Sequence, residues 1–239
     1  RVSFGLFQGT DQMKRLLILG SEEKAHVREA IDGIEPWLSQ RAEVTVDLGM
    51  KKAVGAEQYD LAVVFGGDGS VLRAARVMGR NQLPILGVNT GKFGFLTETT
   101  LEEAREVIEG VLGGNHRVSE RMMLRCRLHR DGKCLVDSIA VNDSVLSRTA
   151  FSRLITVDLL VDGELVTTYR ADGLIVSSPV GSTAHSLSAG GPIIYPEVKA
   201  FVVAPICPHT LTNRPLVLPS QVNIEIGVKE FAEQPALTI

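Results

Sequence analysis

The apolar run Leu61–Val64, followed at once by the glycine-rich segment Phe65–Ser70, most constrains how this chain can fold. Four successive apolar residues predict a strand that is buried on both faces, as in a parallel sheet. Val71–Met78 has the composition of a helix, so the glycines form a strand-to-helix turn. Glycine lets backbone N–H groups approach a phosphate closely, and a helix N-terminus adds partial positive charge. The segment therefore predicts a phosphate-binding turn, with a helix merely capped by Asp68 as the structural alternative.

The first half of the chain alternates short apolar runs with segments of helical periodicity. Strands that alternate with helices predict a parallel α/β sheet. Ser21 is expected to cap the first helix, with Glu22 and Glu23 in its first turn. The expected strands are Lys14–Gly20, Val44–Asp47, Leu61–Phe65 and Pro84–Val88, and the expected helices are Glu22–Leu38, Val71–Met78 and Leu101–Leu112.

After Gly113-Gly114 the pattern changes to short β-rich runs with almost no helical periodicity. Asp131-Gly132 and Asp162-Gly163 each separate two such runs, and Asp-Gly is a strong hairpin dipeptide. We therefore expect an α/β plus all-β fold, with an N-terminal α/β domain over residues 13–113 and a C-terminal β domain over residues 114–239. The expected hairpins pair Leu124–Leu128 with Leu135–Val141, and Ile155–Val161 with Glu164–Thr168.

Composition limits the partners that this chain is expected to have. Hydrophobic residues make up 44% and charged residues 22%, which is ordinary for a globular protein. The net charge of −3 argues against bulk attraction to nucleic acid or anionic membranes. No apolar run approaches the roughly 18 residues of a membrane span. Cys126, Cys134 and Cys207 lie in no metal-ligand spacing, so we expect no metal site built by side chains, and reduced cysteines in a cytoplasmic protein.

A long segment in the second half, Arg170–Pro192, resembles the signature of the NAD kinases, which phosphorylate the adenosine-ribose 2′-hydroxyl of NAD to make NADP. Four further blocks resemble the family, and all five stand in the family's order along the chain: Phe65–Ser70, Gly87–Leu96, Asn142-Asp143, and Pro205–Leu211 with Asn213–Pro215. The resemblance implies an N-terminal α/β domain and a C-terminal β-sandwich with the active site in the cleft between them. It also implies NAD and ATP as substrates, Mg²⁺ as cofactor and a homo-oligomer, either a dimer or a tetramer.

Phosphorylation of a ribose hydroxyl needs a base near the nucleophilic oxygen and donors that shield the phosphate charge. Asp68 is the candidate catalytic base, and Gly66, Gly67 and Gly69 are the candidate phosphate-binding residues. Ser177 maps onto a position that lines the dinucleotide site in the family. The NAD-binding residues that the resemblance implies are Asp68, Gly69, Phe95, Asn142, Asp143, Arg170, Asp172, Thr183, Ala184, His185 and Ser188.

Three positions depart from the family pattern. Ser70 replaces a common threonine and keeps its hydroxyl, whereas Asp143 replaces glutamate and is one methylene shorter. His185 stands where tyrosine is usual; it keeps a flat ring for stacking but has less area, and an ordinary surface histidine is the alternative.

Phe95 is interpreted as an apolar wall for a base or as a core residue. Arg170 is interpreted as a phosphate ligand or as part of a structural ion pair.

Two other functions remain open at this stage. The Gly-Gly-Asp-Gly turn also occurs in phosphofructokinases and in diacylglycerol and sphingosine kinases, but a lipid kinase needs an apolar groove and Asp172–Ser188 is polar. The second alternative is a non-catalytic NAD(P)-binding regulatory protein, against which the intact Asp68 argues. Met13 resembles a native start and family members continue past Ile239, so residues 1–12 are interpreted as an extension and a further C-terminal segment is expected.

Overall fold

The computed structural model describes residues 14–51, 58–91, 94–149, 153–210, 212–231 and 234–239. Met13, Lys92, Phe93 and Leu211, which belong to sequence segments discussed above, lie outside the described residues. The chain forms two compact units, residues 1–118 and residues 119–239. Each unit has its own sheets and its own hydrophobic core, so each has the internal structure of a domain.

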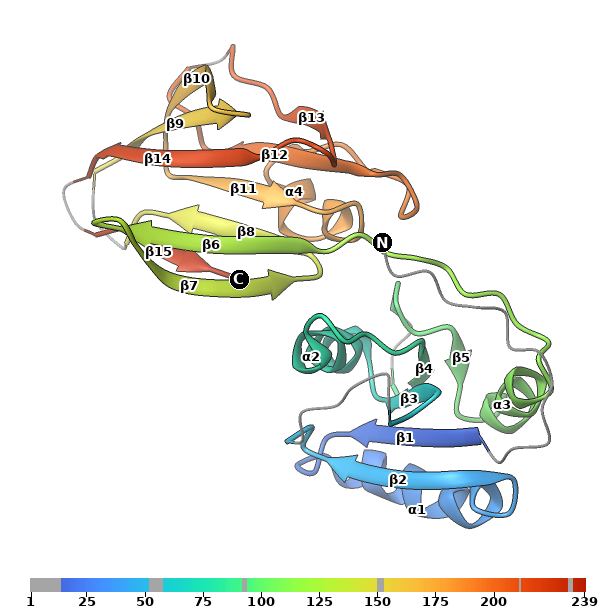
Figure 1. The fold of residues 1–239 in the computed structure, drawn as a ribbon. Helices are drawn as coiled ribbons and strands as arrows, with labels where there is room; N and C mark the ends of the chain where they lie inside the picture. The colour runs from blue at the N-terminus through green and yellow to red at the C-terminus, as the bar shows by residue number, and fades with distance from the viewer. Residues whose placement is uncertain (1–13, 52–57, 92–93, 150–152, 211, 232–233) are drawn as a thin grey trace. The chain divides into compact units, whose positions relative to one another are not determined.

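The N-terminal unit contains the predicted parallel α/β sheet, with strand order β2-β1-β3-β4-β5 (Figure 1). The central strand β3 is buried along its whole length, as its unbroken apolar sequence predicts. In register, Leu16 of β1 pairs with Leu61 of β3, and Phe65 at the end of β3 pairs with Val88 of β4. The strands are β1 (Lys14–Gly20), β2 (Ala42–Leu48), β3 (Leu61–Phe65), β4 (Ile85–Asn89) and β5 (Thr99–Thr100).

Helices cover both faces of this sheet. Helices α1 (Ala25–Leu38) and α3 (Ala104–Leu112) share one core with one face of the strands, and α2 (Asp68–Met78) packs on the opposite face. The strand order reverses between β1 and β3. In open α/β sheets, ligands bind at such a point, just beyond the carboxyl ends of the strands. The buried helix residues of the first core are Val27, Ile31, Ile34, Leu38, Ala104 and Ile108.

Helix α1 begins later than the sequence pattern predicts. It starts at Ala25 rather than Glu22, and its N-cap is Lys24, which makes no side-chain capping hydrogen bond. The prediction of Ser21 as the cap is therefore wrong. The carboxylate of Glu22, outside the helix, forms an ion pair with Lys51, with 2.8 Å between Nζ and Oε1.

Helix α3 also begins later than predicted, at Ala104 rather than Leu101. The Thr100 N–H donates to Glu103 Oε2, and the Glu103 N–H donates to Thr100 Oγ1, each over 3.3 Å. This reciprocal pair is a capping box, and it starts a helical turn just before the regular helix. The apolar periodicity from Leu101 onward reflects that turn.

The C-terminal unit is the predicted β-sandwich of two antiparallel sheets, and it also contains a separate two-stranded antiparallel sheet (Figure 1). Its core contains Val157 and Tyr169 from one sheet and Leu174 and Val203 from the other. Such interdigitation of two inner faces is the usual core of a sandwich. One sheet has the order β10 (Glu164–Ala171), β9 (Ile155–Val161), β14 (Ile224–Glu230), and the other β13 (Leu216–Pro219), β12 (Ala200–Ile206), β11 (Gly173–Ser177), β8 (Asp143–Ser147), β15 (Ala236–Thr238).

Both predicted hairpins are present. The first joins β6 (Leu124–Arg130) to β7 (Lys133–Ala140), and the second joins β9 to β10. Asp131 and Asp162 both have φ of 51°, and the glycines that follow them also have positive φ. Two successive residues with positive φ form the turn type that suits the twist of a hairpin.

The all-β prediction overlooked two short helical elements that cover the outer face of the larger sheet. These are η1 (Val180–Thr183) and α4 (His185–Ser188), and each is only four residues long. Elements of one turn are too short to show helical periodicity in a sequence. The helices in the part of the chain that the structure describes include none long and apolar enough to cross a membrane.

Candidate active site

The turn between β3 and α2 depends on glycine at its first position. Gly66 has φ of 144°, and a Cβ there would collide with Oγ of Ser70. Its N–H donates to the carbonyl of Val88, over 2.9 Å, which attaches the turn to β4. A Cβ on Gly67 or Gly69 would meet nothing within 4 Å among the described residues, so both glycines face open space. An open, glycine-lined helix N-terminus is suited to an anion.

Asp68 is the first residue of α2, and its carboxylate points to another segment of the chain. Oδ2 accepts a hydrogen bond from the N–H of Phe95 over 2.8 Å, and Oδ1 accepts one from the N–H of Leu96 over 2.9 Å. The N-cap of α2 is Gly67, which has no side chain to form a cap. The interpretation of Asp68 as a simple helix cap is therefore wrong, because its carboxylate joins the β3–α2 turn to the segment between β4 and β5.

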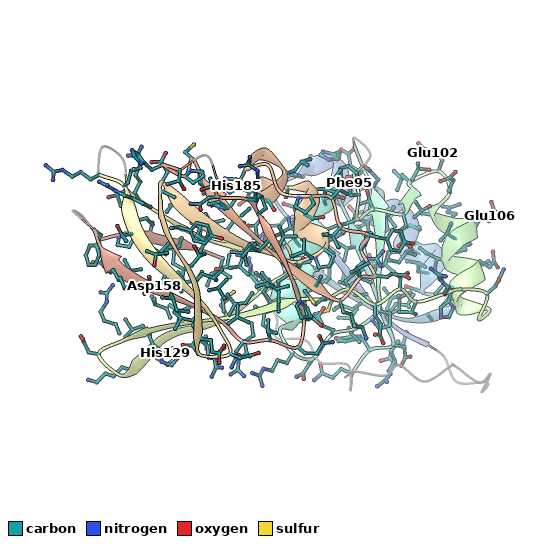
Figure 2. The ribbon with its side chains drawn as sticks, turned by 90° about the horizontal axis from the view of Figure 1, so that it is seen from above. Phe95, Glu102, Glu106, His129, Asp158 and His185 are labelled. Atoms are coloured by element: carbon teal, nitrogen blue, oxygen red, sulfur yellow. The ribbon has the colours of Figure 1, made fainter. Side chains whose placement is uncertain are left out.

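Phe95, which is labelled in Figure 2, is 84% exposed, so the alternative of a core phenylalanine is wrong. Its neighbours are more enclosed: Leu96 is half-buried and Thr97 is buried. The backbone at Phe95 is held by Asp68 while the ring itself lies in solvent. In the N-terminal unit the structure thus brings together Gly66, Gly67, Asp68 and the backbone of Phe95.

In the C-terminal unit, Asn142 and Asp143 lie where β8 begins, beside the end of β11. Asp143 pairs in register with Ser177, and the Ser178 N–H donates to the carbonyl of Asn142 over 2.8 Å. A Cβ on Gly181 would collide with that carbonyl, so only glycine allows η1 to pack there. The structure therefore places the Asn-Asp pair against the segment that leads to the predicted ligands of α4.

Asn142 has a buried side-chain oxygen, Oδ1, with no hydrogen-bond partner among the residues that the structure describes. A buried acceptor without a donor costs about 1–3 kcal/mol. Asn142 Oδ1 can recover that energy by accepting a hydrogen bond from a hydroxyl or amino group of a ligand.

Asp143 and His185 interact electrostatically. Burial raises the pKa of the Asp143 carboxyl above its ordinary value of 3.8, and the positive charge of the His185 imidazole acts in the opposite direction. Asp143 is half-buried, whereas His185, which is labelled in Figure 2, is exposed. The two departures from the family pattern in this unit therefore act on each other.

The remaining candidates around α4 are held mainly through their backbone. The Ala184 N–H donates to the carbonyl of Gly181 over 2.9 Å, and Thr183 Oγ1 donates to the carbonyl of Val180 over 3.2 Å. Thr183 and Ala184 are half-buried, whereas Ser188 is exposed at the end of α4. Each of the three residues therefore keeps some accessible surface for a ligand.

Asp172 lies at the opposite end of the β8–β11 pair from Asp143. Asp143 opens β8 and Arg148, which is bonded to Asp172, follows its last residue, so roughly 16 Å of strand separates the two carboxylates. Sequence reasoning missed Arg148, whose Nε lies 2.5 Å from Asp172 Oδ1. The only signal that could have found Arg148 is that a half-buried carboxylate such as Asp172 needs a positively charged partner. That need does not say which residue the partner is.

Arg170 is exposed on β10, where it pairs in register with Thr156. Its carbonyl accepts a hydrogen bond from the His209 N–H over 2.9 Å. The ion pairs found among the described residues do not include its guanidinium, so its expected role toward a phosphate stays a prediction. The same described ranges hold no group of three or more His, Cys, Asp or Glu side chains able to bind a metal.

Comparison with known families gives the class of protein to which this arrangement belongs. The model of the ATP-NAD kinase N-terminal domain matches residues 21–116, and that of the ATP-NAD kinase C-terminal domain matches residues 141–239. The NAD kinase of Geotalea daltonii is 47% identical over 206 residues, which cover 86% of this chain and 72% of that protein. The NAD kinase of Geobacter metallireducens is 41% identical over 238 residues, covering 95% of this chain and 84% of that protein.

Two solved structures have the same fold. Yeast NADH kinase complexed with NADH superposes with a TM-score of 0.84 and 28% identity, covering 95% of this chain and 75% of that one. An NAD kinase from Archaeoglobus fulgidus in complex with ATP gives a TM-score of 0.72 and 26% identity, covering 93% and 86%. The shared architecture is that of a kinase with an α/β half and a β-sandwich half. The chain belongs to the NAD kinase family.

Proposed function

We propose that this protein transfers the γ-phosphate of ATP to the 2′-hydroxyl of the adenosine ribose of NAD, which forms NADP. The observation that carries the proposal is the match of both halves of the chain to the NAD kinase family. The β3–α2 turn supports it, because Gly66, Gly67 and Gly69 stand with Asp68 at the carboxyl end of a buried parallel strand. Those are the residue types that phosphoryl transfer needs.

ATP is proposed to place its phosphates at the β3–α2 turn. The space beside Gly67 and Gly69 and the N-terminus of α2 favour an anion there. The complex of the Archaeoglobus fulgidus relative with ATP supports this nucleotide as donor. Since the described residues form no three-ligand metal cluster, Mg²⁺ fits best as an ion carried mainly by phosphates and water, as is usual for this ion. Bound in that way, it would neutralise charge on the transferred phosphoryl group.

NAD is proposed to contact both units. In the C-terminal unit, the unpaired Asn142 Oδ1 is an acceptor for a base amino group or a hydroxyl, and the Asp143 carboxylate is an acceptor for ribose hydroxyls. Thr183, Ala184, His185 and Ser188 would border the same ligand, with Arg170, Asp172 and Ser177 contributing elsewhere along it. In the N-terminal unit, Phe95 offers an exposed ring for a base. The expected position of the site between the domains stays a prediction.

Asp68 is proposed as the general base. The proton of the ribose 2′-hydroxyl passes to an oxygen of its carboxylate as the bond from O2′ to the γ-phosphorus forms and the bond from that phosphorus to the bridging oxygen of ADP breaks. Each carboxylate oxygen already accepts one backbone N–H but has a second lone pair for the hydroxyl. The finer points of the proposal are Mg²⁺ as the metal, a cytoplasmic location and a homo-oligomer. The three free cysteines are in keeping with a reducing compartment.

The test is a coupled assay with purified protein, NAD, ATP and MgCl₂, in which NADP is read with an NADP-specific dehydrogenase and ADP release is measured in parallel. NADP formation that stops without ATP or with EDTA is the expected result. Release of ADP with a diacylglycerol or sphingosine acceptor but not with NAD would instead identify a lipid kinase. NAD binding without any ADP release would identify a non-catalytic binding protein.

A further inference from the structure

The segment between β4 and β5 is held to the sheet by hydrogen bonds on both sides of Phe95. The Glu98 N–H donates to the carbonyl of Gly87 over 3.1 Å, and the buried Asn89 Nδ2 donates to Thr97 Oγ1 over 3.2 Å. The oxygen of the same Asn89 amide accepts the N–H of Gly91 over 2.6 Å. These bonds limit how far the backbone of Phe95 can move.

The carboxylate of Asp68 adds two hydrogen bonds to the same segment. Its two oxygens accept the N–H groups of two successive residues, Phe95 over 2.8 Å and Leu96 over 2.9 Å. Hydrogen bonds to an ionised acceptor are roughly twice as strong as neutral ones. Two such bonds to one carboxylate fix both the direction and the position of the backbone. They therefore also fix the position of the Phe95 Cα–Cβ bond, which carries the ring.

Gly94 is the residue that makes this approach possible. A Cβ at Gly94 would overlap the carboxylate of Asp68. The carboxylate cannot turn aside without losing the N–H groups of Phe95 and Leu96, so any larger residue at position 94 must break the arrangement.

We propose that Asp68 and Gly94 are positioning residues that hold the exposed ring of Phe95 as a stacking surface for a flat heterocyclic base. The inference rests on the proposed function for the identity of the base, which belongs to the dinucleotide. A freely moving aromatic ring would lose conformational entropy on stacking, whereas a ring on a fixed backbone loses less. The carboxylate proposed as the base therefore has a second task, which is to hold Phe95.

The first test measures the fixed backbone in the free protein, without any substrate. Amide hydrogen exchange at Phe95 and Leu96 is expected to be at least about 10-fold faster in Asp68→Ala than in the wild-type protein, because both acceptors are removed. Phe95→Ala keeps the backbone N–H groups and is expected to retain their protection. Asp32→Ala, on the exposed side of α1, is the matched control for loss of one aspartate. Unchanged exchange in Asp68→Ala would overturn the proposal.

The second test asks whether the fixed backbone serves the ring. Gly94→Ala keeps the Asp68 carboxylate, and Phe95→Ala removes only the ring; each is expected to raise the KM for NAD about 10-fold and to leave the KM for ATP unchanged. The double variant is expected to resemble either single variant, because both changes remove the same interaction. Gly33→Ala is the control, since a Cβ there would meet nothing within 4 Å.

Multiplicative effects in the double variant, or a Gly94→Ala protein with the wild-type KM for NAD, would show that Gly94 does not act through the ring. Failure of the proposed function is recognised separately. In that case the wild-type protein makes no NADP, yet the exchange measurement still shows whether Asp68 holds the backbone of Phe95.

Discussion

The guanidinium of Arg148 lies 2.5 Å from the carboxylate of Asp172, measured from Nε to Oδ1, and the backbone N–H of Arg148 also donates to the carbonyl of Asp172 over 2.9 Å. Both side chains are less than one third exposed. This pair joins the residue that follows β8 to the residue that precedes β11. It therefore holds the carboxylate that sequence analysis placed in the dinucleotide site.

Arg148→Ala should lower the free energy of unfolding by about 1–3 kcal/mol, because a half-buried carboxylate loses its charged hydrogen-bond partner. The measurement is denaturant unfolding of the whole protein, in which the transition of the C-terminal unit is followed. Arg127→Ala, at an exposed arginine on β6, is the control. The double variant with Asp172→Ala should be less destabilised than the sum of the single changes, and strict additivity would contradict a coupled pair.

Asp68→Asn should lower kcat about 100-fold or more, the usual scale for loss of a general base. NAD affinity should fall by much less, because asparagine keeps one acceptor oxygen for the backbone of Phe95 or Leu96. Turnover is measured by NADP formation at saturating substrates, and affinity by calorimetry. Asp32→Asn should behave as wild type, and a kcat close to wild type in Asp68→Asn would remove the carboxylate from the chemical step.

His185→Ala should raise the KM for NAD and leave the dependence on ATP unchanged, if the imidazole stacks on a base of the dinucleotide. His185→Tyr should preserve or tighten NAD binding, since the larger ring covers more apolar area. Steady-state kinetics with each substrate varied in turn supplies both constants. Equal NAD affinity in all three proteins would make His185 an ordinary exposed residue.

NAD binding should weaken as pH falls through the pKa of Asp143, because the protonated carboxyl no longer accepts two ribose hydroxyls equally. Burial raises this pKa above 3.8, so the loss should begin at a higher pH than for an exposed aspartate. His185→Ala should move the loss to still higher pH by removing the positive charge that favours the carboxylate. Calorimetric titrations from neutral to acid pH check this, and Asp143→Asn should lack the transition.

Lys229→Met should destabilise the protein at neutral pH and have little effect below the pKa of Asp158. The Lys229 ammonium lies 2.7 Å from Asp158 Oδ2, and hydrogen bonds from Lys229 and Thr168 lower the pKa of this carboxyl. A lowered pKa in the folded state contributes stability that is present above about pH 4 and is lost as pH falls through the folded value. Thermal unfolding at neutral and acid pH measures the difference, with Lys133→Met as control.

The element pattern could be predicted from the sequence because its causes are local. Leu61–Phe65 is apolar at every position and is a buried strand, and Asp131-Gly132 and Asp162-Gly163 adopt the positive φ values that their residue types favour. The β3–α2 turn needs glycine at position 66 because Ser70, four residues away, fills the adjacent space. The family resemblance rests on blocks of the same local kind.

The partners of the functional side chains were decided only by the tertiary structure. Asp68 bonds to the backbone of Phe95 and Leu96, which are 27 and 28 residues away, and Arg148 meets Asp172 at a separation of 24 residues. Such contacts depend on how the strands pair and how the loops pack, and no periodicity in the sequence encodes them. For the same reason a composition cannot show that Gly94 has no room for a Cβ, or that Asn142 has a buried oxygen with no hydrogen-bond partner in the described ranges. Both properties depend on atoms that folding brings close together.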